Sequence, residues 1–424
     1  MKVKATYFQN DPQQPLVYGD AELINPPRKR LRGEEEKTGI LAQSVFVGFC
    51  GTDYELMRMG QRGAMTPKFP QGTQQLINGH EGLVWVPEEN RFAIVLIRGG
   101  DSYDPTRFTE DEQYFEYGCD GADGLFSDQN FYHPDMLLRI PDGHVENGKI
   151  ALSTAKKLVF ADPYACMIFQ RERMEDLGEA HLFRVMMARH HCSEAEARRM
   201  AREETFRRVC IFGLGTTGMF IGDLIRQKYP DANIVFVARS EETSPKVAFA
   251  LEKTGATYVK NDFASSDALA DAIRAALGGT ATVFIGASGT AMDSEIAFRH
   301  GVLGCNGIYN SFSLGPQVAV DSMPFGFRNQ LIFGSINFRR DHMEDAIRIL
   351  EQSDYHRIVE LIDREEFTAN PMDAYENKIF CKGAPLKTAV IWNADYVDPT
   401  RYTTGRFMIY EIRLYQRTRS GGDP

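Results

Sequence analysis

The chain has 424 residues, of which 43% are hydrophobic and 25% are charged, an ordinary composition for a globular protein with room for two cores. Its formal net charge of -10 and pI near 5.5 argue against nucleic acid as a partner. No apolar run approaches a membrane span, and seven scattered cysteines favour reduced thiols. We therefore expect a cytoplasmic protein that has no nucleic acid or membrane partner.

The first part of the chain, to about residue 165, is rich in strands and turns. Its N-terminus reads as a strand rather than a signal peptide, and a long acidic, aromatic loop or lobe is expected over residues 99–133. Short apolar runs predict strands at residues 45–48, 82–86 and 92–97.

Residues 171–207 have a different character, because Arg, Glu, Met and Ala dominate and proline is absent. Ser193 followed by Glu196 is the capping-box pattern that opens a helix. One or two surface helices are expected here. We expect Met186 and Met187 to pack in a core rather than to mark a cofactor site.

From residue 209 strands and helices alternate, which predicts a doubly wound parallel sheet. The expected strands cover residues 209–212, 234–237, 256–259 and 281–285, with helices at 219–228, at 244–254 and ending near 277. Later segments read as strands at 307–309, 331–334, 387–392 and 407–414, with a helix at about 342–351.

Two short motifs within the strand-rich part carry metal-binding residue types. They are Cys50-Gly51-Thr52-Asp53 and Gly79-His80-Glu81. A thiolate, an imidazole and a carboxylate suit zinc, whose catalytic sites use three protein ligands and keep one position open. A buried free cysteine and a core histidine satisfied by Glu81 would be the bland alternative for either motif alone. The two motifs together favour the metal.

A glycine-rich turn follows the expected strand at 209–212 and precedes a helix. Glycines in this context allow a tight turn, close approach of a pyrophosphate and helix–strand packing, and the helix N-terminus offers N–H groups to phosphates. A purely structural turn is the alternative. The predicted dinucleotide-binding residues are Gly213, Leu214, Gly215, Thr216, Thr217 and Gly218.

The end of the second strand indicates which coenzyme binds, because NAD sites place an acid there for the ribose 2′-hydroxyl. This chain has Arg239 and Ser240 at that position, and acids enter only at Glu241 and Glu242. Arg239 and Ser240 could face a 2′-phosphate, so NADP is favoured and NAD stays possible. A solvated loop cation is the alternative for Arg239.

Taken together these motifs resemble the zinc-dependent medium-chain dehydrogenases, and most of all their glucose dehydrogenase branch. The likeness extends through segments 114–118, 121–124, 334–337 and 386–390, and covers about residues 1–392. Asp162-Pro163 stands where the branch has Glu-Pro. The resemblance implies an α/β protein, with a GroES-like β-rich catalytic domain at 1–165 and 340–424. A doubly wound Rossmann coenzyme domain would cover 166–339, with a helical insertion near 171–207.

The same resemblance implies roles for individual residues. Cys50 and His80 would bind one catalytic zinc ion, Asp162 would replace a distal glutamate ligand, and Glu81 would ligate directly or through water. Thr52 would hydrogen-bond the substrate oxygen and relay its proton. Asp53 would orient His80, and Glu116 would hold sugar hydroxyls. Ser288 would line the passage of the nicotinamide ribose, and Asn337 would contact the nicotinamide or substrate.

This chain also departs from the branch. Asp162 is one methylene shorter than glutamate, and the segment 99–133 contains only Cys119, so a structural zinc with four cysteine ligands is not expected. The region 171–207 is longer than expected, and the tail from residue 395 has no counterpart in the branch. These differences suggest an altered substrate or assembly.

The sequence therefore predicts a zinc-dependent oxidoreductase that transfers a hydride between a secondary alcohol of a sugar, cyclitol or related polyol and NADP⁺. It is expected to form a homodimer or homotetramer. A redox-neutral lyase or epimerase with a tightly bound nicotinamide cofactor is one alternative. A non-catalytic nucleotide-binding protein is the other.

Overall fold

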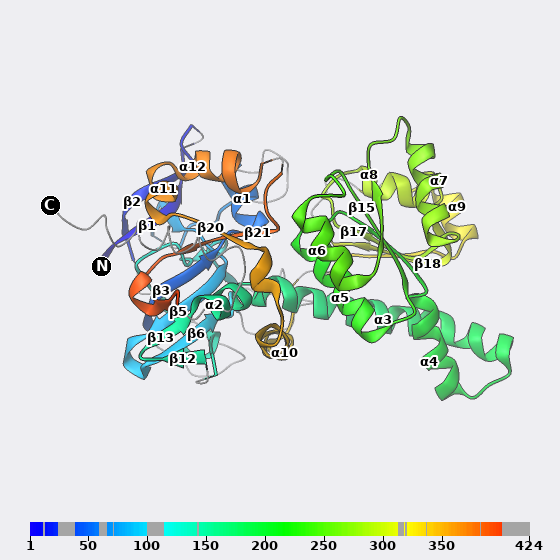
Figure 1. Cartoon of the computed structure of the whole chain (residues 1–424), viewed down its shortest axis with the longest axis horizontal. Coiled ribbons are helices and arrows are strands. Elements are labelled where there is room, and N and C mark those ends of the chain that lie inside the picture. The colour runs from blue at the N-terminus through cyan, green and yellow to red at the C-terminus, as the bar shows by residue number, and fades with distance from the viewer. Residues whose placement is uncertain are drawn as a thin grey trace. The chain divides into compact units, whose positions relative to one another are not determined.

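The computed structural model describes residues 1–11, 13–23, 39–58, 66–70, 72–99, 114–141, 144–312, 318, 320–335, 337–381 and 383–400. Contacts divide the chain into two compact units (Figure 1). The β-rich unit comprises Met1–Asp162 and Arg339–Pro424, and the parallel-sheet unit comprises Pro163–Phe338. The sequence predicts changes of domain at 165/166 and 339/340, a few residues from these divisions.

The largest sheet of the β-rich unit has the order β11-β6-β5-β3-β21-β20, with β10 also paired to β3. Its strands are β3 (Ile40–Gly48), β5 (Glu81–Val86), β6 (Arg91–Val95), β10 (Gln129–Tyr132), β11 (Leu137–Arg139), β20 (Val359–Ile362) and β21 (Lys387–Ile391). β3 and β5 are antiparallel and pair Gly48 with Glu81. The two metal-type motifs therefore leave the same end of this strand pair.

Three smaller sheets complete the strands described in this unit. They are β2-β1-β4 (Leu16–Glu22, Lys2–Gln9, Gln75–Ile77), β12-β13-β22 (Val145–Glu146, Lys149–Ala151, Val397–Asp398) and β7-β8-β9 (Arg98–Gly99, Phe115–Tyr117, Gly121–Ala122). The helices are α1 (Gly51–Met57), α2 (Leu152–Leu158), α10 (Arg340–Glu351), α11 (Arg364–Ala369) and α12 (Pro371–Ala374).

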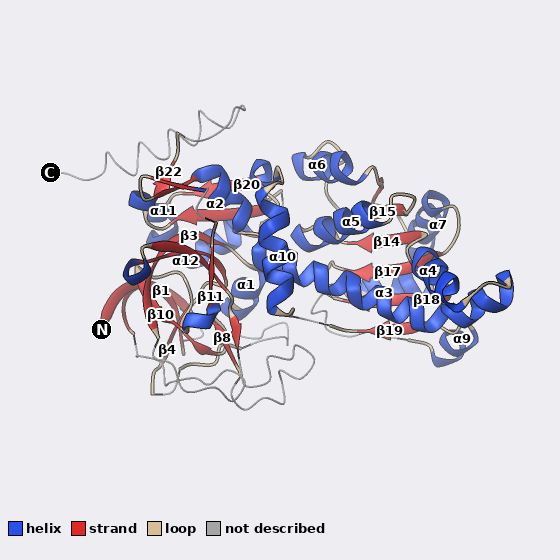
Figure 2. Cartoon of the chain, turned by 90° about the horizontal axis from the view of Figure 1, so that it is seen from below, coloured by secondary structure: helices blue, strands red, loops and turns tan. Residues whose placement is uncertain are grey.

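The parallel-sheet unit contains six parallel strands in the order β16-β15-β14-β17-β18-β19, seen side by side in Figure 2. They are β14 (Arg208–Phe212), β15 (Asn233–Ala238), β16 (Thr257–Lys260), β17 (Ala281–Gly286), β18 (Leu303–Ser311) and β19 (Leu331–Phe333). The central strands are almost wholly buried apolar runs, as expected for strands covered on both faces. This is the doubly wound sheet that the alternation of elements predicts.

Helices pack on both faces of this sheet. α7 (Ser266–Leu277) packs against one face in a core that includes Cys210 and Phe212, whereas α5 (Thr216–Lys228) and α6 (Pro245–Thr254) lie on the other. Because side chains alternate along a strand, Ile211 faces α5 while its two neighbours face α7. Two short helices are α8 (Met292–Ser294) and α9 (Ser322–Phe327).

The segment predicted to hold surface helices forms a hairpin of α3 (Ala161–His190) and α4 (Glu194–Thr205). Ser193 caps α4 as predicted, since its hydroxyl accepts the N–H of Glu196 at 3.3 Å. Met186 packs in an apolar cluster between the two helices, so its predicted packing role is confirmed. α3 begins upstream of the predicted helical segment, because Pro163 falls in the first helical turn, where its missing N–H is not needed.

The two hairpin helices cross closely at Gly178. A Cβ atom at this position would lie 2.0 Å from the hydroxyl oxygen of Thr205, which itself donates to the carbonyl of Ala201 at 2.8 Å. Only a residue without a side chain lets α4 end against α3 in this way.

Two expectations fall outside the described residues: most of the acidic lobe, at 100–113, and the strand at 407–414. Among the residues that are described, no helix is both long enough and apolar enough to cross a membrane.

Candidate active site

His80 lies at the centre of a buried polar cluster in the β-rich unit. It directly precedes β5, and its Nδ1 lies 2.8 Å from Oδ1 of Asp53, a residue of α1. The Asp53 carboxylate also accepts the N–H groups of Gly79 at 3.1 Å and Cys50 at 3.2 Å. Asp53 therefore fixes the ring so that Nε2 is the nitrogen left to face the site, a common arrangement for metal-binding histidines.

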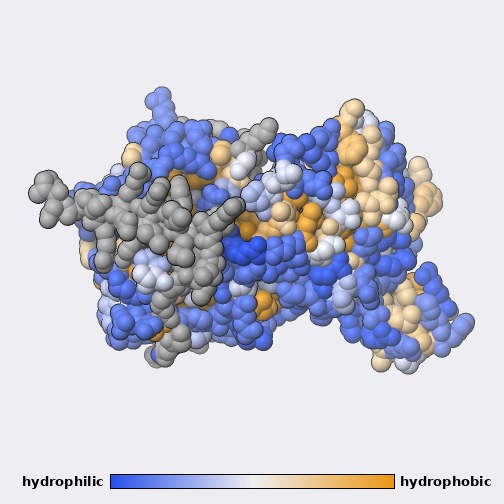
Figure 3. All heavy atoms as spheres, in the orientation of Figure 1, coloured by the Kyte–Doolittle hydropathy of each residue, from blue (hydrophilic) through white to orange (hydrophobic). Residues whose placement is uncertain are grey.

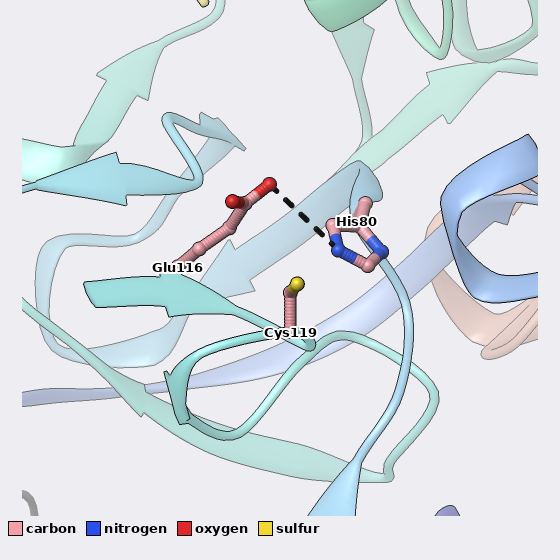
Figure 4. Close-up of side chains that lie close together, drawn as sticks. All are labelled: His80, Glu116 and Cys119. Atoms are coloured by element: carbon pink, nitrogen blue, oxygen red, sulfur yellow. Dashed lines mark ion pairs between the residues drawn. The ribbon is translucent and has the colours of Figure 1, made fainter. Parts of the chain in front are cut away.

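Three potential ligand atoms converge on this side of the ring (Figure 4). The ligand atoms of His80, Glu116 and Cys119 all lie within 4.8 Å of one another, and all three residues are buried. His80 Nε2 has no hydrogen-bond partner among the described residues and lies 3.8 Å from Oε1 of Glu116. A buried imidazole nitrogen without a partner, beside a thiol and a carboxylate, fits a divalent metal such as zinc.

A tight turn brings Cys119 to this position. The N–H groups of Cys119 and Asp120 both donate to the Glu116 carbonyl, at 3.0 and 2.9 Å. Gly118 presses this turn against the segment that precedes His80, since a Cβ on Gly118 would lie 2.6 Å from the Gly79 carbonyl oxygen. The sequence analysis did not include Cys119 among the metal ligands, because a lone cysteine has no spacing signal.

Electrostatics set the protonation of the metal-free cluster. Burial alone lowers the pKa of His80, but the charge and hydrogen bond of Asp53 outweigh it, so the pKa is raised well above 6.5. Burial also raises the pKa of the Cys119 thiol, despite the opposing effect of His80. Metal binding by these groups would therefore release protons.

Cys50 and Thr52 lie at the start of α1, beside the cluster. Cys50 caps this helix, and its Sγ accepts the N–H of Thr52 at 3.4 Å. Both side chains are half-buried. Among the described residues, no group of three metal-type side chains that includes Cys50 has all its ligand atoms within 4.8 Å of one another.

The two carboxylates proposed from sequence as ligands are held by cations instead. Glu81 forms a buried ion pair with Lys387, whose Nζ also donates to the Phe49 carbonyl at 3.0 Å. Asp162 Oδ2 lies 2.9 Å from Nη1 of Arg98. Either carboxylate would have to exchange its partner in order to bind an ion.

Arg98 links Asp162 to Glu116. Its Nη2 lies 3.2 Å from Oε1 of Glu116, and the hydroxyl of Tyr114 donates to Oε2 of the same carboxylate at 2.7 Å. Burial raises the pKa of Asp162, although Arg98 opposes this effect. The structure thus places Glu116, predicted to hold sugar hydroxyls, between the imidazole and a guanidinium.

In the parallel-sheet unit the glycine turn joins β14 to α5. Gly213 has φ +119°, and a Cβ there would lie 2.5 Å from the backbone of Ala287; on Gly218 it would lie 2.1 Å from the Gly213 carbonyl oxygen. Gly213 is therefore required by the close approach of the loop after β17, and Gly218 is required by packing within the turn itself. Gly215 differs, since a Cβ there would meet no described atom within 4 Å. Its open surroundings fit a place kept for a ligand's phosphates.

The other predicted turn residues surround these glycines. Leu214 is buried, Thr216 is the first residue of α5, and Thr217 follows it half-buried. Ser288 lies in the loop after β17, next to Gly213. Its N–H donates to Asp293 at 3.0 Å, and its hydroxyl also bonds that carboxylate. Asn337 is buried, with a left-handed φ of 70°.

The end of β15 gathers positive charge. Arg239 is exposed and acts electrostatically on Lys246, in the first turn of α6; burial and then this neighbour lower the pKa of Lys246. The nearest acid, Glu241, lies 2.9 Å from Lys260. Tyr258 holds the loop by donating to the Ser240 carbonyl at 2.7 Å.

Sequence reasoning therefore missed four residues of the two candidate sites: Cys119, Arg98, Lys387 and Lys246. Arg98, Lys387 and Cys119 act through contacts between segments that are distant along the chain. For Lys246 a usable signal existed, because a strand–turn–helix connection returns the start of the helix to the end of its strand.

The chain is similar to known dehydrogenases in sequence and in fold. Residues 186–389 match the family described as "Glucose dehydrogenase C-terminus". Glucose 1-dehydrogenase of Haloferax mediterranei is 33% identical over 136 residues, which are 28% of this chain and 36% of that protein, so the match spans about a third of its length. Glucose 1-dehydrogenase 2 of Caldivirga maquilingensis is 23% identical over 72% of this chain and 78% of its own.

The solved structure of Haloferax mediterranei glucose dehydrogenase with NADP, Zn and gluconolactone is similar in fold. Its TM-score is 0.64 at 18% identity, covering 92% of this chain and 99% of that chain. The protein thus shares the fold of that dehydrogenase, with a sheet-rich unit and a Rossmann-like unit built on a six-stranded parallel sheet. The match of residues 186–389 to the glucose dehydrogenase family model agrees with the resemblance that the motifs predicted.

Proposed function

We propose that this protein is a zinc-dependent oxidoreductase that transfers a hydride between a secondary alcohol of a sugar, cyclitol or related polyol and NADP⁺. The observation that carries the proposal is the buried His80 imidazole. Its Nδ1 is held by Asp53, and its Nε2 has no described hydrogen-bond partner and faces Glu116 and Cys119. Relatives named glucose dehydrogenases support the substrate class.

His80 is the ligand common to both possible zinc-binding sets. The motifs assign Cys50, with Glu81 or Asp162, whereas the geometry adds Cys119 and Glu116. When bound, zinc would act as a Lewis acid on the substrate hydroxyl, and the nicotinamide would accept the hydride. Four cysteine ligands for a second, structural zinc are not expected in this chain.

The protein's own groups would orient the substrate and move its proton. Thr52, at the start of α1, would accept a hydrogen bond from the substrate hydroxyl and pass its proton towards solvent. Glu116, which Arg98 and Tyr114 hold in place, would accept hydrogen bonds from neighbouring sugar hydroxyls. Fixed donors and acceptors of this kind align the reacting carbon without further ordering.

We propose NADP rather than NAD as the coenzyme. Arg239 and Lys246 form no hydrogen bond or ion pair with any described residue. Their positions, after β15 and in the first turn of α6, support a role in binding a 2′-phosphate. Glu241, which could have bound a ribose hydroxyl, is engaged by Lys260. Gly213 to Gly218 would bind the pyrophosphate, and Ser288 and Asn337 would line the nicotinamide end.

Self-association as a homodimer or homotetramer remains part of the proposal, as does a cytoplasmic location. Met323 and Phe327 of α9 are 65% and 81% exposed. This helix directly precedes β19, the last strand in the order of the parallel sheet. Apolar colouring covers α9 at the right edge of Figure 3. Exposed aromatic surface beside a strand edge that no described strand covers is typical of a subunit contact.

Metal analysis combined with a substrate panel tests the proposed function. The purified protein should contain about one zinc per chain. It should reduce NADP⁺ with at least one aldose, cyclitol or polyol, followed by the absorbance of NADPH over many turnovers. A protein without stoichiometric zinc, or one whose bound coenzyme never accumulates in reduced form, would contradict it.

A further inference from the structure

A cavity of about 220 Å³ lies within the parallel-sheet unit, between the α3–α4 hairpin and the starts of three strands. Leu182 and Met186 line it from α3, and Arg189, Arg207 and Arg208 contribute three positive charges. Glu204 is the single acidic residue among its described lining residues, and it lies 2.9 Å from Arg207. The cavity therefore carries an excess of two positive charges.

The arginines of this region divide into two groups. Arg198, Arg199 and Arg202 of α4 each form an ion pair with a glutamate. Arg189 and Arg208, which line the cavity, form no ion pair with any described residue. Among the described residues, Arg189 and Arg208 thus lack the acidic partner that Arg207 and the three arginines of α4 each have.

Arg208 is held rigidly, with part of its guanidinium removed from water. The backbone N–H of Arg208 donates to the Thr282 hydroxyl at 3.0 Å, and that hydroxyl donates back to the backbone carbonyl of Arg208 at 2.9 Å. Its Nε is buried without a partner among the described residues. Burial and the neighbouring Arg207 lower the pKa of Arg208, although Glu204 opposes them. Unpaired buried donors of this kind call for an ion or water.

The cavity lies at the opposite end of the sheet from the glycine turn. Its strand residues are at the starts of β14, β17 and β18, whereas Gly213 follows the end of β14. Ligands of open parallel sheets bind at the carboxyl ends of the strands, so a coenzyme would leave this cavity free.

We propose that this cavity binds a small anion of the phosphate type, with Arg208 and Arg189 as its charged ligands. A volume of 220 Å³ holds such an anion together with a few waters, and is smaller than pockets for drug-sized ligands. The bound anion joins the hairpin to the starts of β14, β17 and β18. The site is independent of the proposed activity, because it involves none of the zinc or coenzyme residues.

Calorimetric titration with inorganic phosphate tests the site, at constant ionic strength and with the protein saturated with NADPH so that the coenzyme phosphate positions are filled. One saturable site per chain is expected. Arg208→Met should weaken it about tenfold or more, because a charged hydrogen-bonding partner is lost. The matched control Arg199→Gln, on the same hairpin but paired with Glu203, should change the affinity less than about twofold. Binding that is absent, or that is equal in Arg208→Met and the parent, overturns the proposal.

A second measurement needs no substitution. Cys305 is exposed and lines the same cavity, whereas the half-buried thiol of Cys381 lies in the other unit. Phosphate should slow maleimide labelling of Cys305 about threefold or more at saturation and leave Cys381 unchanged, as followed by peptide mass spectrometry. Equal labelling of Cys305 with and without phosphate overturns the proposal, even if Arg208→Met does not fold.

Discussion

The two units build their candidate sites in different ways. In the parallel-sheet unit, backbone geometry at consecutive residues makes the site, with Gly213 and Gly218 packed into a strand-to-helix turn. In the β-rich unit, side chains from separate segments make it, with Asp53, His80 and Cys119 meeting in the core. A site of the first kind can be recognised from a local sequence motif, whereas a site of the second kind depends on how the strands pair.

Substitution of His80 should have the largest effect, and this effect should be confined to the candidate site of the β-rich unit. His80→Ala should remove stoichiometric zinc and lower kcat/KM by about a thousandfold or more, since a Lewis acid contributes several kcal/mol. NADPH affinity should not change, because the coenzyme residues lie in the other unit. Elemental analysis and fluorescence titration of NADPH measure the two effects.

Matched thiol variants sharpen this test. Comparing the zinc content of Cys50→Ala with that of Cys119→Ala shows which thiolate holds the ion. Cys381 is half-buried in the same unit, so Cys381→Ala is the control. Asp53→Asn should weaken zinc binding by about 10- to 100-fold, because the imidazole loses its anchor. Full zinc content in both Cys50→Ala and Cys119→Ala would refute a thiolate ligand.

The glycine turn allows a paired experiment on the backbone-built site. Gly218→Ala places a Cβ 2.1 Å from the Gly213 carbonyl oxygen, so it should lower the melting temperature and abolish coenzyme binding. Gly215→Ala meets no described atom within 4 Å and should leave the melting temperature unchanged while weakening NADPH. If Gly215→Ala binds NADPH normally, the open position does not serve the pyrophosphate.

Coenzyme choice gives a smaller effect. Arg239→Ala and Lys246→Ala should each weaken NADPH by about tenfold, as expected for one charged hydrogen bond, and change NADH by less than about twofold. Lys253→Ala, in the last turn of the same helix α6, is the control. Dissociation constants for both coenzymes decide the question, and equal losses for NADPH and NADH would speak against a 2′-phosphate at this position.

The last prediction concerns stability rather than activity. Lys156 of α2 is 1% exposed, and burial lowers its pKa to about 7, although Glu360 opposes this. Because the unfolded chain binds this proton up to about pH 10.5, stability should rise as the pH increases from 7 to 10.5 and fall again on acidification. Lys156→Met should flatten this dependence and raise the unfolding free energy at pH 7 by a few kcal/mol, about 1.4 per pKa unit.

Denaturant unfolding of parent and variant at pH 7 and pH 10 measures the effect of Lys156 as a difference, so other titrating groups cancel. Parallel stability curves at both pH values would show that Lys156 is charged and paired in the folded protein.

The same contrast explains how far the sequence could be interpreted. The strands and helices of the parallel-sheet unit were predictable because β14, β15 and β17 are apolar runs separated by clear turns and helical segments. The start of α3 was missed, since Asp162-Pro163 carries no helical signal on its own. His80 was found from its motif, but Cys119 was not, because its approach depends on the turn after β8. Lys387 pairs with Glu81 only because β21 adds to the sheet beside β3.

Gly178 gives the hairpin a mechanical role that no chemical motif reveals. The hydroxyl of Thr205 seats in the notch that this glycine leaves, and three residues later the chain enters β14. Any larger side chain at Gly178 would push the end of α4 outwards and pull on the first residue of that strand. This helix crossing, which contains none of the proposed zinc or coenzyme residues, thus helps to fix the position at which β14 begins. A substitution at Gly178 would shift the start of that strand and, through it, the alignment of the neighbouring strands.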